Sequence, residues 1–197
     1  MVIYRKADES DFTSILWLQK KNLLQNLEPQ DQQDGFLSIE YPHDQLEILN
    51  NQLGIFVAVA NNRLSGFLIA QTMDFALQSP LINTMVRRFP HVLYQSRPLS
   101  GYRTFIYGPV CVDRQSRGQG ILEGLFNVML QTLKGHFDVG VAFVSEQNPR
   151  SLHAHVDKLG LKMADEFEFN GQKYWTLVFG LKLQGRERKH ENMGHPS

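Results

Sequence analysis

The segment that decides the fold reads Val110-Cys111-Val112-Asp113-Arg114-Gln115-Ser116-Arg117-Gly118-Gln119-Gly120-Ile121-Leu122. It leads from an apolar strand through a short turn into a helix. Glycines at 118 and 120 let the backbone adopt positive φ and approach a ligand closely. The first N–H groups of the helix have no intrahelical acceptor and lie at the positive end of the helix dipole, which suits a phosphate or pyrophosphate. Arg117 can add charge-assisted hydrogen bonds.

The same turn also has a purely structural interpretation, as a glycine-rich link between a strand and a helix. It is not a P-loop, because no Gly-Lys-Ser/Thr follows. It is not the dinucleotide-binding fingerprint either, because the third glycine and a well-placed downstream acid are missing. By itself the turn favours a phosphate site and a structural link about equally.

The segments on both sides of the turn predict an α/β domain with one mixed sheet. Helix 118–134 carries an apolar ridge at every fourth position (Ile121, Leu125, Met129, Leu133). Asn61-Asn62 and Asn170-Gly171 are turn signals that predict hairpins. Segment 26–42 is polar and is expected to be a loop. The expected strands are 2–7, 54–60, 64–72, 104–112, 137–145, 162–169 and 173–183. Three further helices are expected: one after the capping residues 8–11, one that begins at 41–44, and one over 148–159.

The length of 197 residues fits one domain with a sizeable core. We expect this domain to cover residues 1–183. Residues 73–103 contain Pro80, Pro90 and Pro98 between helical stretches and are interpreted as an insertion on the side of the domain where an acceptor would bind. Residues 184–197 are polar without apolar periodicity, so the sequence predicts a disordered tail.

The composition argues against several classes of partner. Lys and Arg total 20 and Asp and Glu total 20, so the formal net charge is zero and no attraction to nucleic acid or to an anionic membrane is expected. The longest apolar run, near 53–60, is too short to span a bilayer. With Cys111 as its single cysteine the chain has no intrachain disulfide, which is compatible with a reducing compartment. We therefore expect a cytoplasmic protein.

A second segment strengthens the ligand interpretation of the turn. It reads Asn148-Pro149-Arg150-Ser151-Leu152-His153-Ala154-His155-Val156-Asp157-Lys158-Leu159-Gly160-Leu161 and also follows a strand. Together the two segments resemble the GNAT superfamily of acetyltransferases, which carries Gln/Arg-x-x-Gly-x-Gly/Ala between a strand and a helix. Two registers fit: Gln115 to Gly120 matches literally, whereas Arg117 to Leu122 fits the distance from the strand but has Leu122 where a small residue is usual. The resemblance is good from about 104 to 183, and before that it rests on element order.

The resemblance implies a single GNAT-like domain: a mixed, mostly antiparallel sheet of six to seven strands, flanked by helices, with a V-shaped splay between strands 104–112 and 137–145. It also implies acetyl-CoA as the acyl donor, with its pantetheine amides paired to strand backbone and its pyrophosphate on the turn. The residues implied to bind it are Val110, Cys111, Val112, Arg117, Gly118, Gln119, Gly120, Ile121, Leu122, Asn148 and Ser151.

Three residues are candidates for proton transfer. Many GNAT proteins protonate the departing CoA thiolate with a tyrosine, and His155 takes the corresponding place, with one extra residue before Gly160. Its alternative is an ordinary helix histidine. The acceptor amine must also lose a proton, and Glu146 or Tyr107 could take it. Their alternatives are a solvated carboxylate and a core aromatic ring.

Two further patterns favour structural roles. Cys111 suggests a covalent acyl-enzyme, but its apolar neighbours favour a small buried core residue. His153 and His155 look like a metal pair, yet residues two apart on a helix point to different faces. The sequence therefore predicts no metal site.

The function predicted is an N-acetyltransferase that moves the acetyl group of acetyl-CoA to a primary amine, on a small molecule or a peptide, by direct attack in a ternary complex. No nucleic-acid or membrane partner is expected, and a homodimer is left open. One alternative is a non-catalytic acyl-CoA-binding or sensing module on the same fold. Another is a protein-interaction domain whose glycine turn is structural. Six aromatic residues are candidates for an acceptor pocket or for packing of the insertion: Phe36, Tyr41, Phe75, Phe89, Tyr94 and Tyr102.

Overall fold

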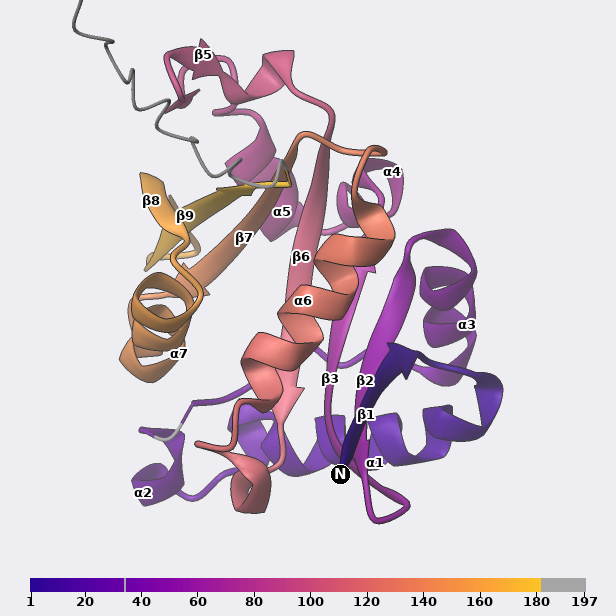
Figure 1. Ribbon diagram of the computed structural model, residues 1–197. Helices are drawn as coiled ribbons and strands as arrows, with labels where there is room; N and C mark the ends of the chain where they lie inside the picture. Colours follow the sequence, from indigo (N-terminus) through magenta and orange to yellow (C-terminus); the bar gives the residue numbers. More distant parts are fainter. Residues whose placement is uncertain (34, 182–197) are drawn as a thin grey trace, which may run out of the picture.

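A computed structural model describes residues 1–33 and 35–181 of the chain (Figure 1). One seven-stranded sheet runs through the domain in the order β1-β2-β3-β6-β7-β9-β8. Every neighbouring pair is antiparallel except β6 and β7, so the predicted mixed, mostly antiparallel sheet is confirmed. The tail predicted at 184–197 lies outside the described residues. The strands are β1 Val2–Lys6, β2 Gly54–Ala60, β3 Arg63–Gln71, β6 Thr104–Val112, β7 Val139–Ser145, β8 Lys162–Phe169 and β9 Gln172–Gly180.

Helices cover both faces of the sheet. Successive strand residues point to opposite faces, so each strand contributes apolar side chains to a core on either side. On β2, Phe56 and Ala58 face the core under α6 (Ile121–Leu133), whereas Ile55 and Val57 face the core under α1 (Phe12–Asn22) and α3 (His43–Gln52). The ridge predicted from the sequence is confirmed as the buried side of α6. Figure 1 shows α6 lying on one face of the sheet and running alongside β6.

Some boundaries differ from the prediction for local reasons. Helix α6 begins at Ile121 rather than at 118, because Gly118 and Gly120 have φ of +77° and +76° and cannot continue a right-handed helix. The loop predicted at 26–42 contains a short helix, α2 (Pro29–Gln32), with proline at its first position.

The segment 73–103 folds as a separate small layer. It contains α4 (Met73–Ala76), α5 (Pro80–Val86) and a short hairpin, β4 (Leu93–Tyr94) with β5 (Arg97–Pro98). Most of its buried side chains form a third core with residues of β6, β7, β8 and β9, whereas Phe75 packs in the core under α1 and α3. Phe89 is part of that core and Tyr94 and Tyr102 pack against it, so these aromatics pack the segment onto the sheet.

The strands β6 and β7 separate after a short parallel contact. Their register runs from Thr104–Val139 to Ile106–Val141 and includes no later pair among the described residues. Beyond this point β6 continues to Val112 and β7 to Ser145, and the two strands diverge (Figure 1). Unpaired strand backbone must find another partner, so the predicted V-shaped splay creates a place for a ligand with amide groups.

Candidate functional site

Two cavities meet inside the splay between β6 and β7. One, of about 180 Å³, is bounded by the glycine turn and is called the turn cavity here. The other, of about 280 Å³, lies toward β7 and α5 and is called the apolar cavity. Six residues line both: Phe36, Leu37, Val110, Asn148, Ser151 and His155.

The glycine turn forms one wall of the turn cavity. Gly118 and Gly120 both line it, and Gly120 is the N-cap of α6 in a left-handed conformation. A Cβ atom added at either glycine would meet nothing within 4 Å, so backbone conformation rather than crowding requires glycine there. A glycine cap has no side chain to accept the first helix N–H groups, and the first residues of α6, Ile121 to Glu123, line the cavity, so this helix end can donate hydrogen bonds to an anion.

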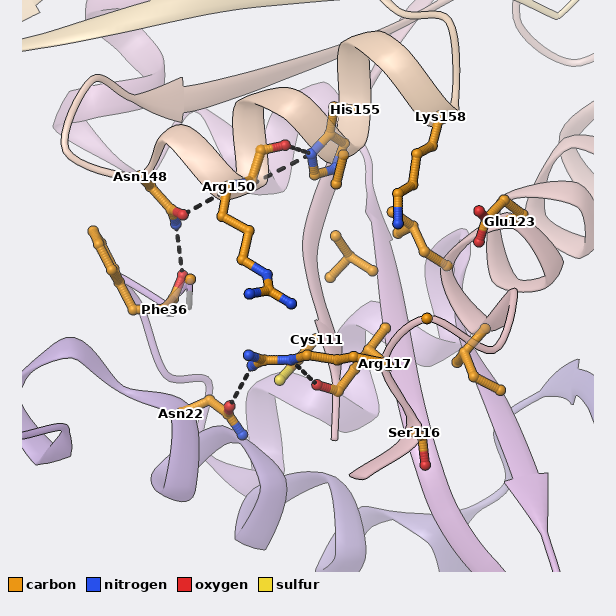
Figure 2. Close-up of a pocket in the computed structure, with 18 of the residues that line it drawn as sticks. Asn22, Phe36, Cys111, Ser116, Arg117, Glu123, Asn148, Arg150, His155 and Lys158 are labelled. Atoms are coloured by element: carbon orange, nitrogen blue, oxygen red, sulfur yellow. Dashed lines mark hydrogen bonds between the residues drawn. The ribbon is translucent and has the colours of Figure 1, made fainter. Parts of the chain in front are cut away.

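Three cationic side chains line the turn cavity. Arg117 donates from Nε to the Val112 carbonyl at 3.2 Å and from Nη2 to Asn22 Oδ1 at 3.3 Å. Figure 2 shows the Arg117 side chain lying across the cavity while that of Arg150 points into it from above. Lys158 lines the cavity as well, and Glu123 is the acidic residue among its described lining. The balance is positive and suits a polyanion such as a pyrophosphate.

The literal register of the motif, from Gln115 to Gly120, places its first residue away from the cavity. Arg117 lines the turn cavity, but Gln115 is exposed and not among its described lining residues. Its carbonyl accepts from Gln119 Nε2 at 3.0 Å. The geometry therefore favours the register that begins at Arg117, in which Leu122 also lines the cavity.

Cys111 sits in the strand wall as a buried thiol. It is 6% exposed, and burial raises its pKa to about 12, although Arg117 and Lys21 act in the opposite direction. A thiol with this pKa is almost entirely protonated at neutral pH and is a poor nucleophile. The geometry supports the packing interpretation of Cys111.

Asn148 connects the helix after β7 to the segment that closes both cavities. Its Oδ1 accepts from the backbone N–H of Ser151 at 3.2 Å and caps α7 (Pro149–His153). Its Nδ2 donates to the Phe36 carbonyl at 3.1 Å, as Figure 2 shows. Asn148 therefore holds Phe36 against the mouth of the splay.

Four residues of the helical segment 149–158 form one stripe along the turn cavity: Ser151, Ala154, His155 and Lys158. They are spaced i, i+3, i+4 and i+7, the spacing of neighbours on one helix face. The second half, Ala154–Lys158, is π-helical and ends before Gly160, whose φ is +72°. A π turn holds one residue more than an α turn. It thus takes up the extra residue between His155 and Gly160 while His155 stays buried.

His155 and Tyr107 form a hydrogen-bonded pair where the cavities meet. His155 Nδ1 lies 2.7 Å from the Ser151 carbonyl oxygen, which can only accept, so Nδ1 carries the hydrogen. Burial lowers the pKa of His155, against the smaller opposing effect of that carbonyl, and keeps the ring neutral. His155 Nε2 is therefore an acceptor, and Tyr107 Oη donates to it at 3.2 Å. Burial raises the pKa of Tyr107, so the phenol keeps its proton.

The structure brings most of the predicted site residues together. Among the residues predicted to bind the cofactor, Gln119 is the one absent from the described lining of the turn cavity; it is exposed. Among the predicted proton-transfer residues, His155 and Tyr107 are in contact. Glu146 is exposed, bonds to Lys173 through its backbone N–H, and does not line either cavity within the described chain. Of the six aromatics, Phe36 and Tyr41 line the apolar cavity.

Sequence reasoning missed several lining residues. Lys158 and Ala154 carried a usable signal, because they share a helix face with Ser151 and His155. Asn22, Gly35 and Leu37 carried none, although Phe36 between them was named as a pocket candidate. Their positions depend on contacts with distant residues, including Arg114 Nη1 with Asp31 Oδ1 at 2.7 Å and Asn148 with Phe36.

The remaining candidates do not converge on a metal site. His153 Nδ1 lies 2.5 Å from Asp157 Oδ2 on the exposed side of the helix, while His155 faces inward. Residues 1–33 and 35–181 contain no group of three or more His, Cys, Asp or Glu residues placed to hold a metal ion. None of the helices in the same residues is long and apolar enough to cross a membrane.

Several solved structures similar to this chain are acetyltransferases. The ribosomal-protein-S18-alanine N-acetyltransferase of Escherichia coli matches with a TM-score of 0.59 and 11% identity, covering 95% of this chain and 98% of that one. A GNAT-family acetyltransferase of Streptococcus pneumoniae gives a TM-score of 0.58 at 12% identity over 91% and 99%. The yncA protein of Salmonella typhimurium, solved with acetyl-CoA as its cofactor, gives 0.58 at 15% over 93% and 96%.

No protein-family model and no curated protein matches the sequence. At identities of 11 to 15% the structural matches establish the fold. The chain has the GNAT fold, which confirms the fold class predicted from the two motif segments.

Proposed function

We propose that this chain, which has the fold of the GNAT acetyltransferases, transfers the acetyl group of acetyl-CoA to a primary amine. The observation that carries the proposal is the meeting of two cavities at one proton-accepting pair. A positively lined turn cavity and an apolar cavity join at His155, whose Nε2 accepts from Tyr107. A donor and an acceptor entering from opposite sides would meet there.

The charge of the turn cavity suits the donor. The N–H groups at the start of α6, together with Arg117, Arg150 and Lys158, would hold the phosphates of CoA. The edge of β6 that faces away from β3, at Val110 to Val112, would pair with the amides of the pantetheine arm beside the Val112 carbonyl that accepts from Arg117. This arrangement directs the thioester toward Val110 and His155, which line both cavities.

The reaction proposed is direct attack by the amine on the thioester carbonyl. A C–N bond forms, the C–S bond breaks, and the CoA thiolate leaves. Backbone N–H groups of β6 would stabilise the charge that develops on the carbonyl oxygen. The chain therefore mainly positions the reactants and moves a proton.

The proton of the amine would travel through Tyr107 to His155. As Tyr107 Oη takes the amine proton, its own proton passes to His155 Nε2. The imidazolium so formed keeps its Nδ1 hydrogen bond to the Ser151 carbonyl. His155 then returns the proton to the departing thiolate, so the pair ends each cycle in its starting state. Glu146 is not assigned a role, because it is exposed outside both cavities.

The proposed activity also has a domain, a cellular location and an acceptor group. We assign the activity to one domain, residues 1–183, with segment 73–103 on the acceptor side, because Ser79, Leu81 and Ile82 line the apolar cavity. A cytoplasmic location is part of this proposal. The acceptor carries a primary amine, as does the protein alanine named for the Escherichia coli structure.

Two measurements test this function. Isothermal calorimetry with acetyl-CoA tests the donor site: binding is expected, and the absence of binding at millimolar ligand would contradict the proposal. Release of the CoA thiol, followed with a chromogenic thiol reagent across a panel of amines, tests transfer. Binding without release for any amine would instead support a non-catalytic acyl-CoA-binding module.

A further inference from the structure

We infer that the acceptor is a primary amine on an apolar body of about one ring, without a second charged group. This inference rests on the proposed acetyl transfer and names its substrate class. It is carried by the charge, the hydrogen bonding and the size of the apolar cavity.

The described lining of the apolar cavity contains no Asp, Glu, Lys or Arg. The titratable side chains in that lining are Tyr41, Tyr107 and His155, and burial favours the neutral form of each. A polyamine, a lysine side chain or a free amino acid would bring charged groups into this space without a counter-ion, which is strongly unfavourable. The cavity therefore selects against acceptors with several charges.

Three polar side chains that line the cavity, Tyr41, Gln71 and Asn148, already have partners. Tyr41 Oη donates to Gln71 Oε1 at 3.2 Å, and Gln71 Nε2 donates to the Gly108 carbonyl at 2.5 Å. Asn148 uses both ends of its amide on Ser151 and Phe36. A peptide would bury N–H and C=O groups that need partners of their own. The cavity is better matched to a hydrocarbon body than to a peptide chain.

The volume sets the size of that body. The cavity measures about 280 Å³, at the lower edge of the roughly 300–1,000 Å³ typical of ligand pockets. An apolar cavity of about 150 Å³ is enough to bind benzene. One aromatic ring with a short chain therefore fits, and Ile39, Leu81, Ile82, Phe143 and Val144 provide apolar walls for it.

The two ends of the cavity fix how such an amine would lie. Its polar end is the Tyr107–His155 pair beside the turn cavity. The apolar walls extend away from this pair toward α5. An amine with its ring against these walls would present its nitrogen to Tyr107 and to the thioester, and it would bind as the neutral amine that attack requires.

The test compares 2-phenylethylamine with spermidine and with a short peptide that has an N-terminal alanine. Calorimetry on the CoA-saturated protein is expected to show at least tenfold tighter binding of 2-phenylethylamine, and kcat/KM for acetylation should follow the same order. Equal binding, or a preference for spermidine or the peptide, overturns the inference and leaves acetyl transfer intact. Failure to bind acetyl-CoA contradicts the proposed function itself, and the inference with it.

A pair of variants locates the effect in the apolar cavity. Ile39 lines the cavity and is 38% exposed, so Ile39→Glu places a carboxylate at the rim without filling the core. We expect the preference for 2-phenylethylamine over spermidine to fall at least threefold. Ile48→Glu is the control, because Ile48 on α3 is 46% exposed and does not line the cavity. An unchanged preference in Ile39→Glu, or an equal fall in both variants, overturns the inference.

Discussion

Tyr107 on β6 and His155 on the π-helical turn form an edge-to-face ring contact and share a hydrogen bond. Their ring centroids lie 5.4 Å apart at an interplanar angle of 82°, and Tyr107 Oη lies 3.2 Å from His155 Nε2. Both side chains are almost fully buried. Because Ser151 fixes the hydrogen on Nδ1, the pair holds one defined proton acceptor at the junction of the two cavities.

Replacing Tyr107 with Phe tests the proton path. We expect kcat to fall about 10²-fold, within the range of general acid–base catalysis, with the Kd for acetyl-CoA unchanged. Losing the donor to His155 Nε2 should also cost about 1–3 kcal/mol of stability. Steady-state kinetics and urea unfolding measure the two effects.

The matched control for that variant is Tyr174→Phe. Tyr174 is also largely buried, and its hydroxyl donates to Gln172 Oε1 at 3.0 Å outside the described lining of either cavity. It should keep full kcat. A Tyr107→Phe enzyme as fast as Tyr174→Phe would remove Tyr107 from the mechanism.

His155 should make the protein sensitive to acid. Burial lowers its folded-state pKa below the ordinary 6.5, so the unfolded chain binds the proton more readily. Stability should therefore fall as the pH drops below about 6.5 and level off below the folded-state pKa. In His155→Gln this part of the acid dependence should disappear. Urea unfolding at intervals from pH 8 to pH 5 compares the two proteins, and parallel curves would contradict the assignment.

Gly120→Ala separates the anion site from general stability. The substitution forces a Cβ onto a left-handed residue, at a cost of about 1–2 kcal/mol, and places a methyl group where the phosphate is proposed to bind. We expect acetyl-CoA affinity to fall at least tenfold by calorimetry. Gly171→Ala is the control, because Gly171 has φ of +74°, is equally uncrowded and lies in the β8–β9 hairpin. Equal affinities in the two variants would argue that the turn is only structural.

The cations of the turn cavity should act through charge. Arg150→Gln and Lys158→Gln should each weaken acetyl-CoA binding about twofold to fivefold at low salt, since exposed ion pairs contribute about 1 kcal/mol or less. The loss should shrink near 1 M salt, where the Debye length is about 3 Å. Lys162→Gln, on β8 outside both described linings, should bind normally. Calorimetry at two salt concentrations measures the affinity for acetyl-CoA, and a loss of affinity that does not depend on salt would indicate structural damage instead.

Much of the fold could be predicted because its signals are local. The ridge on α6, the apolar β7 and the Asn170-Gly171 turn each lie within a few residues of sequence, and each is found as expected. The loop around Pro29 and the start of α6 were misplaced. There, short-range backbone geometry set the boundary rather than hydrophobic periodicity.

The features of the site likewise separate into local ones and ones that depend on distant contacts. The sequence by itself determined the glycine turn and the Asn148 cap, because left-handed backbone and a helix N-cap are properties of adjacent residues. Only the tertiary structure decided that Tyr107 meets His155, 48 residues away, and that Asn148 holds Phe36, 112 residues away. Such contacts arise when the sheet and its helices pack. Packing also buries His155 and leaves no Asp, Glu, Lys or Arg in the described lining of the apolar cavity, and the inferred acceptor class rests on these two features.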